Sequence, residues 1–146
     1  MTHPKPTILP STYTQRTPPE TFPTSNHGDI YWHTLISSPK TDSTDLCAGI
    51  ATCPPASGHL CAHRHMQSEI YHILEGDGEV TIDGVSSRVQ AGSTVFIPSD
   101  AEHGIVNTGT VDLRWLYVFP TGSFEDIVYR FTGQEAEGKG MEKAKL

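Results

Sequence analysis

The sequence predicts an all-β domain, either a sandwich or a barrel of short antiparallel strands. From residue 29 onward, short runs rich in β-branched and aromatic residues recur at regular spacing. Glycine, proline, serine and aspartate separate these runs, and almost no stretch has the 3.6-residue periodicity of an amphipathic helix. Many short strands with turn residues between them are typical of β-sandwiches and barrels.

Composition sets the size and excludes two classes of partner. A chain of 146 residues with 36% hydrophobic residues is long enough for one domain with its own core. Its net charge of −7, from 10 basic and 17 acidic residues, argues against a nucleic-acid partner, which requires a concentrated basic surface. The same charge argues against docking on an anionic membrane.

The cysteines and the N-terminus predict a cytoplasmic protein. Cys47, Cys53 and Cys61 are odd in number and show no C-x-x-C spacing, so a disulfide framework is not expected. The first residues lack the basic and then apolar pattern of a secretory signal. No apolar run approaches the roughly 20 residues that cross a bilayer.

Three segments are expected along the chain. Residues 1–27 hold six of the eleven prolines and should form an extended arm that wraps either the barrel or a partner subunit. Residues 28–131 should form the β-domain. Residues 132–146, rich in glycine, glutamate and lysine, should form a flexible tail.

The expected strands are bounded by turn residues. Asp83-Gly84 should form a two-residue hairpin turn, because both residues tolerate positive φ. Residues 123–131 are ambiguous: Ser123 with Asp126 suggests a helix start, whereas Ile127-Val128-Tyr129 favours a strand, which we expect. The other predicted strands are Ile30–Ile36, Leu46–Thr52, Glu69–Leu74, Glu79–Asp83, Ser87–Val89, Thr94–Ile97, His103–Asn107 and Leu113–Phe119.

A histidine cluster is the strongest indication of chemistry. Four of the eight histidines lie between residues 59 and 72. On a strand, His63 and His65 share a face about 7 Å apart, and two imidazoles so placed can bind one metal ion at about 2 Å each. Glu69 has the same parity if the strand continues. His103, at the start of a later strand, can join them because antiparallel strands bring distant positions side by side.

These two stretches resemble the paired signature motifs of the cupin superfamily. In the first motif, His63, His65, Glu69 and Gly76 match the family pattern. One spacing differs, because four residues separate Gly58 from His63 where the family has five.

The second motif also matches, with one substitution. Gly92, Pro98, His103 and Asn107 agree with the family pattern, and Asp100 stands where the family has a glycine. Aspartate tolerates the left-handed conformation better than most residues, so the turn should be retained.

The resemblance implies a fold and an assembly. It covers roughly residues 46–119 and is that of a small, single-domain, metal-binding cupin. It implies a conical antiparallel β-barrel of the jelly-roll type, which usually pairs into a homodimer. It also implies one divalent metal ion per chain, held by His63, His65, Glu69 and His103. Fe²⁺ or Mn²⁺ is expected, although ligand type leaves Zn²⁺, Ni²⁺ and Cu²⁺ open.

The predicted function is a metal-dependent enzyme acting on a small oxygenated organic molecule. Three imidazoles and a carboxylate leave about two positions open on a six-coordinate ion, where substrate, water or O₂ can bind. Cupins with this ligand set include dioxygenases, decarboxylases, isomerases and lyases, and O₂-dependent oxidation is narrowly favoured. The alternatives are a non-redox lyase, decarboxylase or isomerase that uses the ion as a Lewis acid, and a ligand-binding cupin without catalysis.

Two neighbouring residues on the Glu69 strand are expected to differ in role. Tyr71 should share the inward face of Glu69 and either orient substrate, act as an acid or base, or pack in the barrel wall. His72, which is out of step with Glu69, should face away. Further along, Trp115, Tyr117 and Phe119 alternate on one face and are expected in the core or a dimer interface, with pocket lining as the second possibility.

Overall fold

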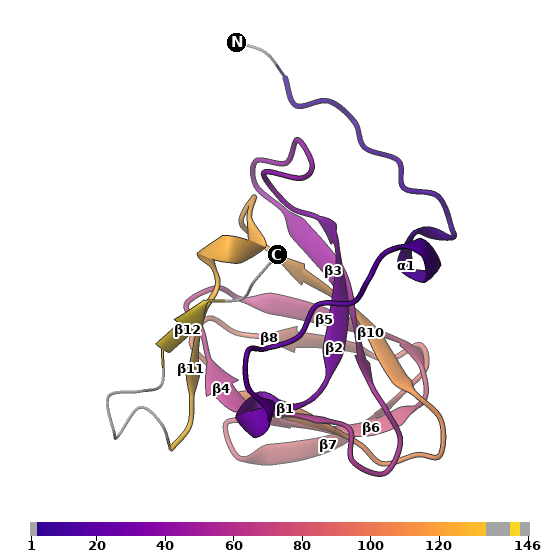
Figure 1. Cartoon of the computed structure of the whole chain (residues 1–146). Coiled ribbons are helices and arrows are strands. Elements are labelled where there is room, and N and C mark those ends of the chain that lie inside the picture. The colour runs from indigo at the N-terminus through magenta and orange to yellow at the C-terminus, as the bar shows by residue number, and fades with distance from the viewer. Residues whose placement is uncertain (1–2, 134–140, 144–146) are drawn as a thin grey trace.

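Two antiparallel sheets enclose the interior of the computed structural model, which describes residues 3–133 and 141–143 (Figure 1). The helical elements are single turns: α1 (Tyr13–Arg16), η1 (Ser25–His27) and η2 (Phe124–Asp126). The strands are β1 (Gly28–Asp29), β2 (Tyr31–Ile36), β3 (Cys47–Cys53), β4 (His59–Arg64), β5 (Glu69–Glu75), β6 (Asp77–Ile82), β7 (Val85–Gln90), β8 (Thr94–Ile97), β9 (His103–Asn107), β10 (Leu113–Phe119), β11 (Val128–Phe131) and β12 (Met141–Lys143).

The strand order is that of a jelly-roll barrel, which confirms the all-β prediction. One sheet runs β12-β11-β4-β9-β6-β7, with β1 also paired to β4, and we call it the histidine sheet. The second sheet runs β2-β3-β10-β5-β8, and we call it the glutamate sheet. Neighbours such as β4 and β9 lie far apart in the sequence, so the fold brings distant residues together. The Asp83-Gly84 turn joins β6 to β7 as predicted, with φ values of 48° and 81°.

The core is formed by the inward faces of both sheets. Along β10, every second residue is buried, including Trp115, Tyr117 and Phe119. This confirms the expected core reading, and Trp115 and Tyr117 also line an internal cavity. The opposite face of the glutamate sheet exposes Ile70 and Phe96, which are paired across β5 and β8. The homodimer that the cupin resemblance implies stays a prediction.

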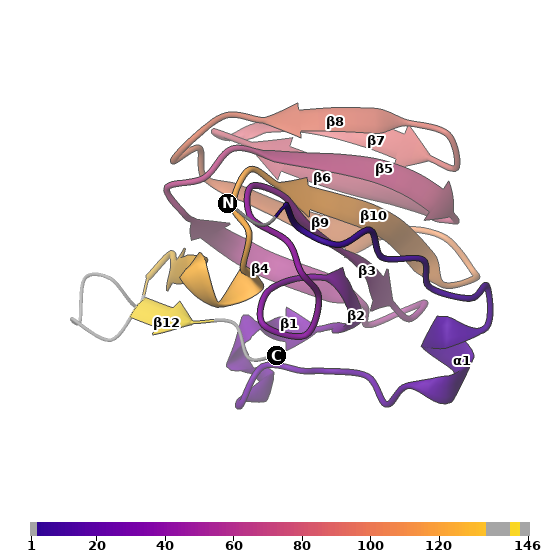
Figure 2. The same ribbon diagram turned by 90° about the horizontal axis from the view of Figure 1, so that it is seen from above.

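The N-terminal segment is mostly irregular and lies against its own barrel. Glu20 pairs with Trp32 of β2 through two backbone hydrogen bonds of 2.7 and 3.0 Å. The Glu20 carboxylate also accepts the backbone N–H of Thr34 at 2.8 Å. Figures 1 and 2 show α1 on the side of β2 and β3, away from β7. No helix in the described part of the chain is long and apolar enough to span a bilayer.

The end of the chain combines helix and strand signals. Ser123 accepts a hydrogen bond from the Glu125 N–H and caps η2, and the strand β11 follows, as expected from the run at Ile127. Within the predicted tail 132–146, the residues 134–140 and 144–146 lie outside the described residues. Residues 141–143 form β12, which pairs with β11.

The turn at Asp100 positions two histidines. Asp100 adopts a φ of 61°, so aspartate does accept the left-handed conformation at the glycine position. Its N–H donates to the carbonyl of His65 at 2.9 Å, and Arg64 donates to its carbonyl at 2.9 Å. The turn that leads into His103 is thereby tied to the end of β4.

Asn107 holds the other end of β9. Its side-chain amide donates to the carbonyls of Cys53 at 2.9 Å and Val111 at 2.8 Å. Its carbonyl oxygen accepts the N–H of Gly109 at 2.9 Å. These bonds satisfy a buried polar side chain and fix the turn that leads toward β10.

The left-handed turn gives a test of stability. Asp100→Val places a β-branched residue at positive φ and should lower the free energy of unfolding by about 2 kcal/mol. Asp100→Asn tolerates the same φ and removes only the half-exposed ion pair with Arg130, so it should cost under about 1 kcal/mol. Urea unfolding of both variants measures the difference. Equal losses would show that the charge, not the backbone, matters at this turn.

Candidate metal centre

Three buried histidines converge at one point inside the barrel. His63 lies on β4, His65 follows the end of that strand, and His103 is the first residue of β9. Their exposed fractions are 0%, 1% and 1%, and one ring nitrogen from each lies within 4.8 Å of the others. His63 is directly paired with His103 across the two strands. Such a group of imidazoles can hold a metal ion.

A β-bulge sets the position of His63. Between Leu60 and His63, β4 has one residue more than the facing part of β9, so the pairing register shifts. Both Leu60 and His63 consequently point into the barrel, while Cys61 between them is only half-buried. Strict alternation along the strand would have placed Cys61 on the inward side.

Backbone hydrogen bonds fix which nitrogen of each imidazole faces the centre. The Nδ1 atoms of His63, His65 and His103 lie 2.8, 2.9 and 2.8 Å from backbone carbonyl oxygens. A carbonyl only accepts, so each Nδ1 carries the proton and donates it. Each Nε2 therefore presents a lone pair, and all three Nε2 atoms are buried without a hydrogen-bond partner. This is the arrangement that a metal-ligating histidine requires.

Burial lowers the pKa of two of these imidazoles, His63 and His103. Burial and the neighbouring His103 and His65 place the pKa of His63 well below its ordinary value. Burial also lowers the pKa of His103, although the Glu69 carboxylate opposes that shift. Neutral imidazole is the form that binds a metal, so the site is prepared for an ion near neutral pH.

Glu69 brings a carboxylate to the same point from the opposite sheet. Its Oε2 lies 3.3 Å from Nε2 of His65 and 4.0 Å from Nε2 of His103, and it has no hydrogen-bond partner. Glu69 begins β5, as predicted, whereas β4 ends at Arg64, so the strand of the histidines does not continue to Glu69. The chain crosses from one sheet to the other between His65 and Glu69. Three imidazoles and a carboxylate fit a divalent first-row metal ion.

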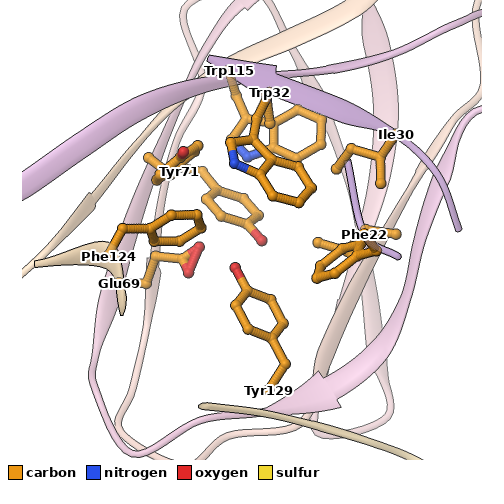
Figure 3. A pocket seen from close by; sticks show the side chains of 11 residues that line it. Phe22, Ile30, Trp32, Glu69, Tyr71, Trp115, Phe124 and Tyr129 are labelled. Atoms are coloured by element: carbon orange, nitrogen blue, oxygen red, sulfur yellow. The ribbon is translucent and has the colours of Figure 1, made fainter. Parts of the chain in front are cut away.

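Tyr71 lies on the inward face, as predicted, and shares its surroundings with a second tyrosine. Its exposed fraction is 1%, and it lines the same internal cavity as Glu69. Figure 3 shows the hydroxyl groups of Tyr71 and Tyr129 turned toward each other beside Glu69. Burial and the Glu69 charge raise the pKa of both phenols well above 10. His72 faces away, as expected, and bonds to Thr94.

Tyr129 is a site residue that the sequence reasoning missed. It lies on β11, whose alternating burial directs Tyr129 and Phe131 inward. The Tyr129 ring stacks on that of His63 at 4.8 Å. The alternation of Ile127, Tyr129 and Phe131 in the sequence indicated that these side chains share an inward face. It did not place Tyr129 at the metal centre, because that placement depends on the pairing of β11 with β4, which the spacing did not predict.

An aromatic cavity adjoins the metal centre. It contains about 300 Å³ of space between atoms. Four ionisable groups line it, the Glu69 carboxylate and the phenols of Tyr71, Tyr117 and Tyr129, and Figure 3 shows three of them, Glu69, Tyr71 and Tyr129. The remaining wall is largely aromatic or aliphatic and includes Phe22, Ile30, Trp32, Trp115 and Phe124. The lining therefore suits a small organic molecule that has one polar end and an apolar body.

Comparison with known proteins identifies the family. A family model described as "Cupin domain" matches residues 49–119. Dimethylsulfoniopropionate lyase DddW from Ruegeria pomeroyi is 48% identical over 107 residues, which are 73% of this chain and 68% of that relative. The chain belongs to the cupin family.

Two further proteins support the same assignment. An oxalate-binding protein from Thermotoga maritima is 39% identical over 66 residues, which are 44% of this chain and 54% of that protein. The crystal structure of a predicted oxalate decarboxylase from Thermotoga maritima superposes with a TM-score of 0.66 at 26% identity. That superposition covers 79% of this chain and 99% of the other.

The proposed ligands can be tested by metal content. Protein purified without chelator should contain about one metal ion per chain, measured by elemental analysis. His63→Ala removes an inward Nε2 and should lower the content more than about tenfold, since even changes outside the ligands cost 10–100-fold in affinity. His72→Ala, on the same stretch but facing outward, is the control and should retain the ion. Loss of metal in His72→Ala alone would contradict the assignment.

The buried imidazoles also predict a pH dependence of stability. The pKa values of His63 and His103 are lower in the folded protein than the ordinary 6.5 of the unfolded chain. The unfolded chain therefore binds more protons below pH 6.5, and the metal-free protein should lose stability as the pH falls. The slope is at most about 1.4 kcal/mol per pH unit for each histidine.

Urea unfolding of chelator-treated protein at several pH values between 7.5 and 5 measures this slope. His63→Gln removes one of the two shifted groups and should give a shallower dependence than the unaltered protein. Identical slopes in the two proteins would mean that His63 is not held neutral by burial.

Proposed function

We propose that this protein is a metal-dependent lyase that cleaves dimethylsulfoniopropionate to dimethyl sulfide and acrylate. The observation that carries the proposal is the 48% identity to a dimethylsulfoniopropionate lyase over 73% of this chain. The site supports it, because three histidines that could hold a metal ion adjoin an aromatic cavity. Non-redox lyase activity, an alternative that the sequence left open, thus fits this similarity better than the O₂-dependent oxidation that was narrowly favoured.

The reaction needs a base and a place for a carboxylate. The carbon next to the carboxylate loses a proton, a carbon–carbon double bond forms, and the carbon–sulfur bond breaks with its electron pair passing to sulfur. Dimethyl sulfide, acrylate and one proton result. Neither oxidant nor water is consumed, so the reaction requires no O₂.

The proposed ligands are His63, His65, Glu69 and His103, and Fe²⁺ or Mn²⁺ is the expected ion. When bound, the ion supplies positive charge that holds the substrate carboxylate and offsets the effect of the Glu69 charge on Tyr71. The three imidazoles arrive already oriented by their Nδ1 hydrogen bonds to the backbone. Binding therefore costs little reorganisation of these side chains.

Tyr71 is the proposed base. It lines the cavity together with Glu69, so a substrate carboxylate at the metal centre would place the adjacent carbon near its phenol oxygen. Burial is the largest cause of its high pKa, and the Glu69 charge is the second. Tyr129 turns its hydroxyl toward that of Tyr71 (Figure 3), so we expect it to influence the ionisation of the proposed base.

The aromatic wall suits the other end of the substrate. A sulfonium group carries positive charge on a small apolar body, and aromatic rings attract such cations through their negative faces. Trp32 and Trp115 border the cavity and are only 3% and 1% exposed. The wall also keeps water away from the developing charge.

A second candidate function is ligand binding without catalysis. The 39% identity to an oxalate-binding protein over 66 residues favours it. Both functions place a carboxylate at the metal centre, so they differ in turnover alone.

The lyase can be tested by gas chromatography of dimethyl sulfide above the metal-loaded protein. Anaerobic and aerobic samples should release it at equal rates. Tyr71→Phe should lower kcat by about 10²–10⁴-fold, the usual contribution of a general base. The matched control is Tyr31→Phe on β2, a half-buried tyrosine that does not border the cavity, and it should retain activity.

Three results would count against this scheme. Turnover that requires O₂ would support the oxidation reading instead. Tight binding of dimethylsulfoniopropionate without release of dimethyl sulfide would support the binding reading. Full activity in Tyr71→Phe would show that Tyr71 is not the base, although the proposed lyase activity would still stand.

A further inference from the structure

The aromatic cavity is closed to an organic substrate in this structure. The part of it that the centre of a water molecule can occupy is about 20 Å³, which is room for one or two water molecules. A sulfonium carboxylate needs several times that space. Part of the wall must therefore move before a substrate can enter.

A second hollow lies directly outside one part of this wall. It is lined by residues 21–25 and 28–30, and the space open to a water centre is about 250 Å³. Phe22 and Ile30 are the two residues that line both this hollow and the inner cavity. The two side chains thus separate the reaction chamber from an open depression on the surface.

Phe22 is the more loosely held of the two. Ile30 is 8% exposed and lies between β1 and β2, which pair with β4 and β3. Phe22 is half-buried, and residues 21–23 form no backbone hydrogen bond within the described ranges 3–133 and 141–143. The segment is fixed on either side, by Glu20 on β2 and by the stacking of His27 on Phe131 at 3.8 Å.

Ring contacts hold Phe22 over the chamber. Its ring meets four others edge-on: Trp32 at 4.8 Å, His27 and Tyr129 at 5.3 Å, and Phe131 at 5.5 Å. Rotation of the ring exchanges these contacts without breaking a hydrogen bond. Figure 3 shows Phe22 and Ile30 on the side of the cavity opposite Glu69, so a substrate with its carboxylate at the metal centre beside Glu69 directs its other end toward Phe22.

We propose that the Phe22 side chain is the gate of the reaction chamber and sets the size limit for the alkyl groups on the substrate's cationic end. The size limit rests on the proposed lyase function, whereas the gate itself does not. The N-terminal segment, outside the residues 49–119 that match the family model, is thereby a specificity element of this chain.

The size limit is tested by comparing two substrates, dimethylsulfoniopropionate and its diethyl analogue, by the kcat/KM for release of the dialkyl sulfide. Phe22→Ala should raise the ratio of diethyl to dimethyl kcat/KM by about tenfold or more, the usual effect of a methylene group in an apolar pocket. Phe22→Trp should lower the ratio. Phe96→Ala, a phenylalanine exposed on the glutamate sheet, is the control and should leave it unchanged.

The gate is tested separately by acrylamide quenching of fluorescence. The chain has 2 tryptophans, Trp32 and Trp115, and both border the cavity. Phe22→Ala should raise the quenching constant severalfold, while Phe96→Ala should not change it. Phe22→Leu, which retains apolar packing, should give an intermediate value and serves as the second variant if Phe22→Ala does not fold.

The outcomes separate the two proposals. Absence of dimethyl sulfide from the unaltered, metal-loaded protein would reject the lyase, and the quenching measurement would still decide the gate. Normal lyase activity with an unchanged substrate ratio and unchanged quenching in a folded Phe22→Ala or Phe22→Leu protein would reject the gate and leave the lyase in place.

Discussion

Three hydrogen bonds from imidazole Nδ1 atoms to backbone carbonyls determine what this protein can bind. Each bond is local, reaching a carbonyl two residues away, and each turns a lone pair of Nε2 toward the same point. A buried polar atom without a partner costs about 1–3 kcal/mol, and here three such nitrogens lie together with a carboxylate oxygen. A cation bound at this point would remove that cost.

The surrounding barrel keeps these groups in position from several directions. His63 and His103 are paired across β4 and β9, and the turn at Asp100 ties the chain before His103 to the backbone of His65. Asn107 fixes the far end of β9. The aromatic rings then exclude water from the side of the centre where a substrate would lie, so charge interactions there are stronger than at the surface.

The sequence was sufficient for the strands and for the residues of the centre, but not for their geometry. Strand parity, together with the resemblance to the two cupin motifs, selected His63, His65, Glu69 and His103. The change of sheet between His65 and Glu69 and the bulge before His63 leave no clear trace in composition. Tyr129 and Phe22 reach the cavity through long-range packing, which local patterns do not encode.

The ligands come from both halves of the barrel. Three imidazoles belong to the histidine sheet and its end, and the carboxylate belongs to the glutamate sheet. An ion held by all four is therefore a cross-link between the halves, formed only when both are folded. Mass action then makes the folded population rise with the concentration of free metal. The lifetime of this protein in a cell would follow the supply of its ion, even when no substrate is present.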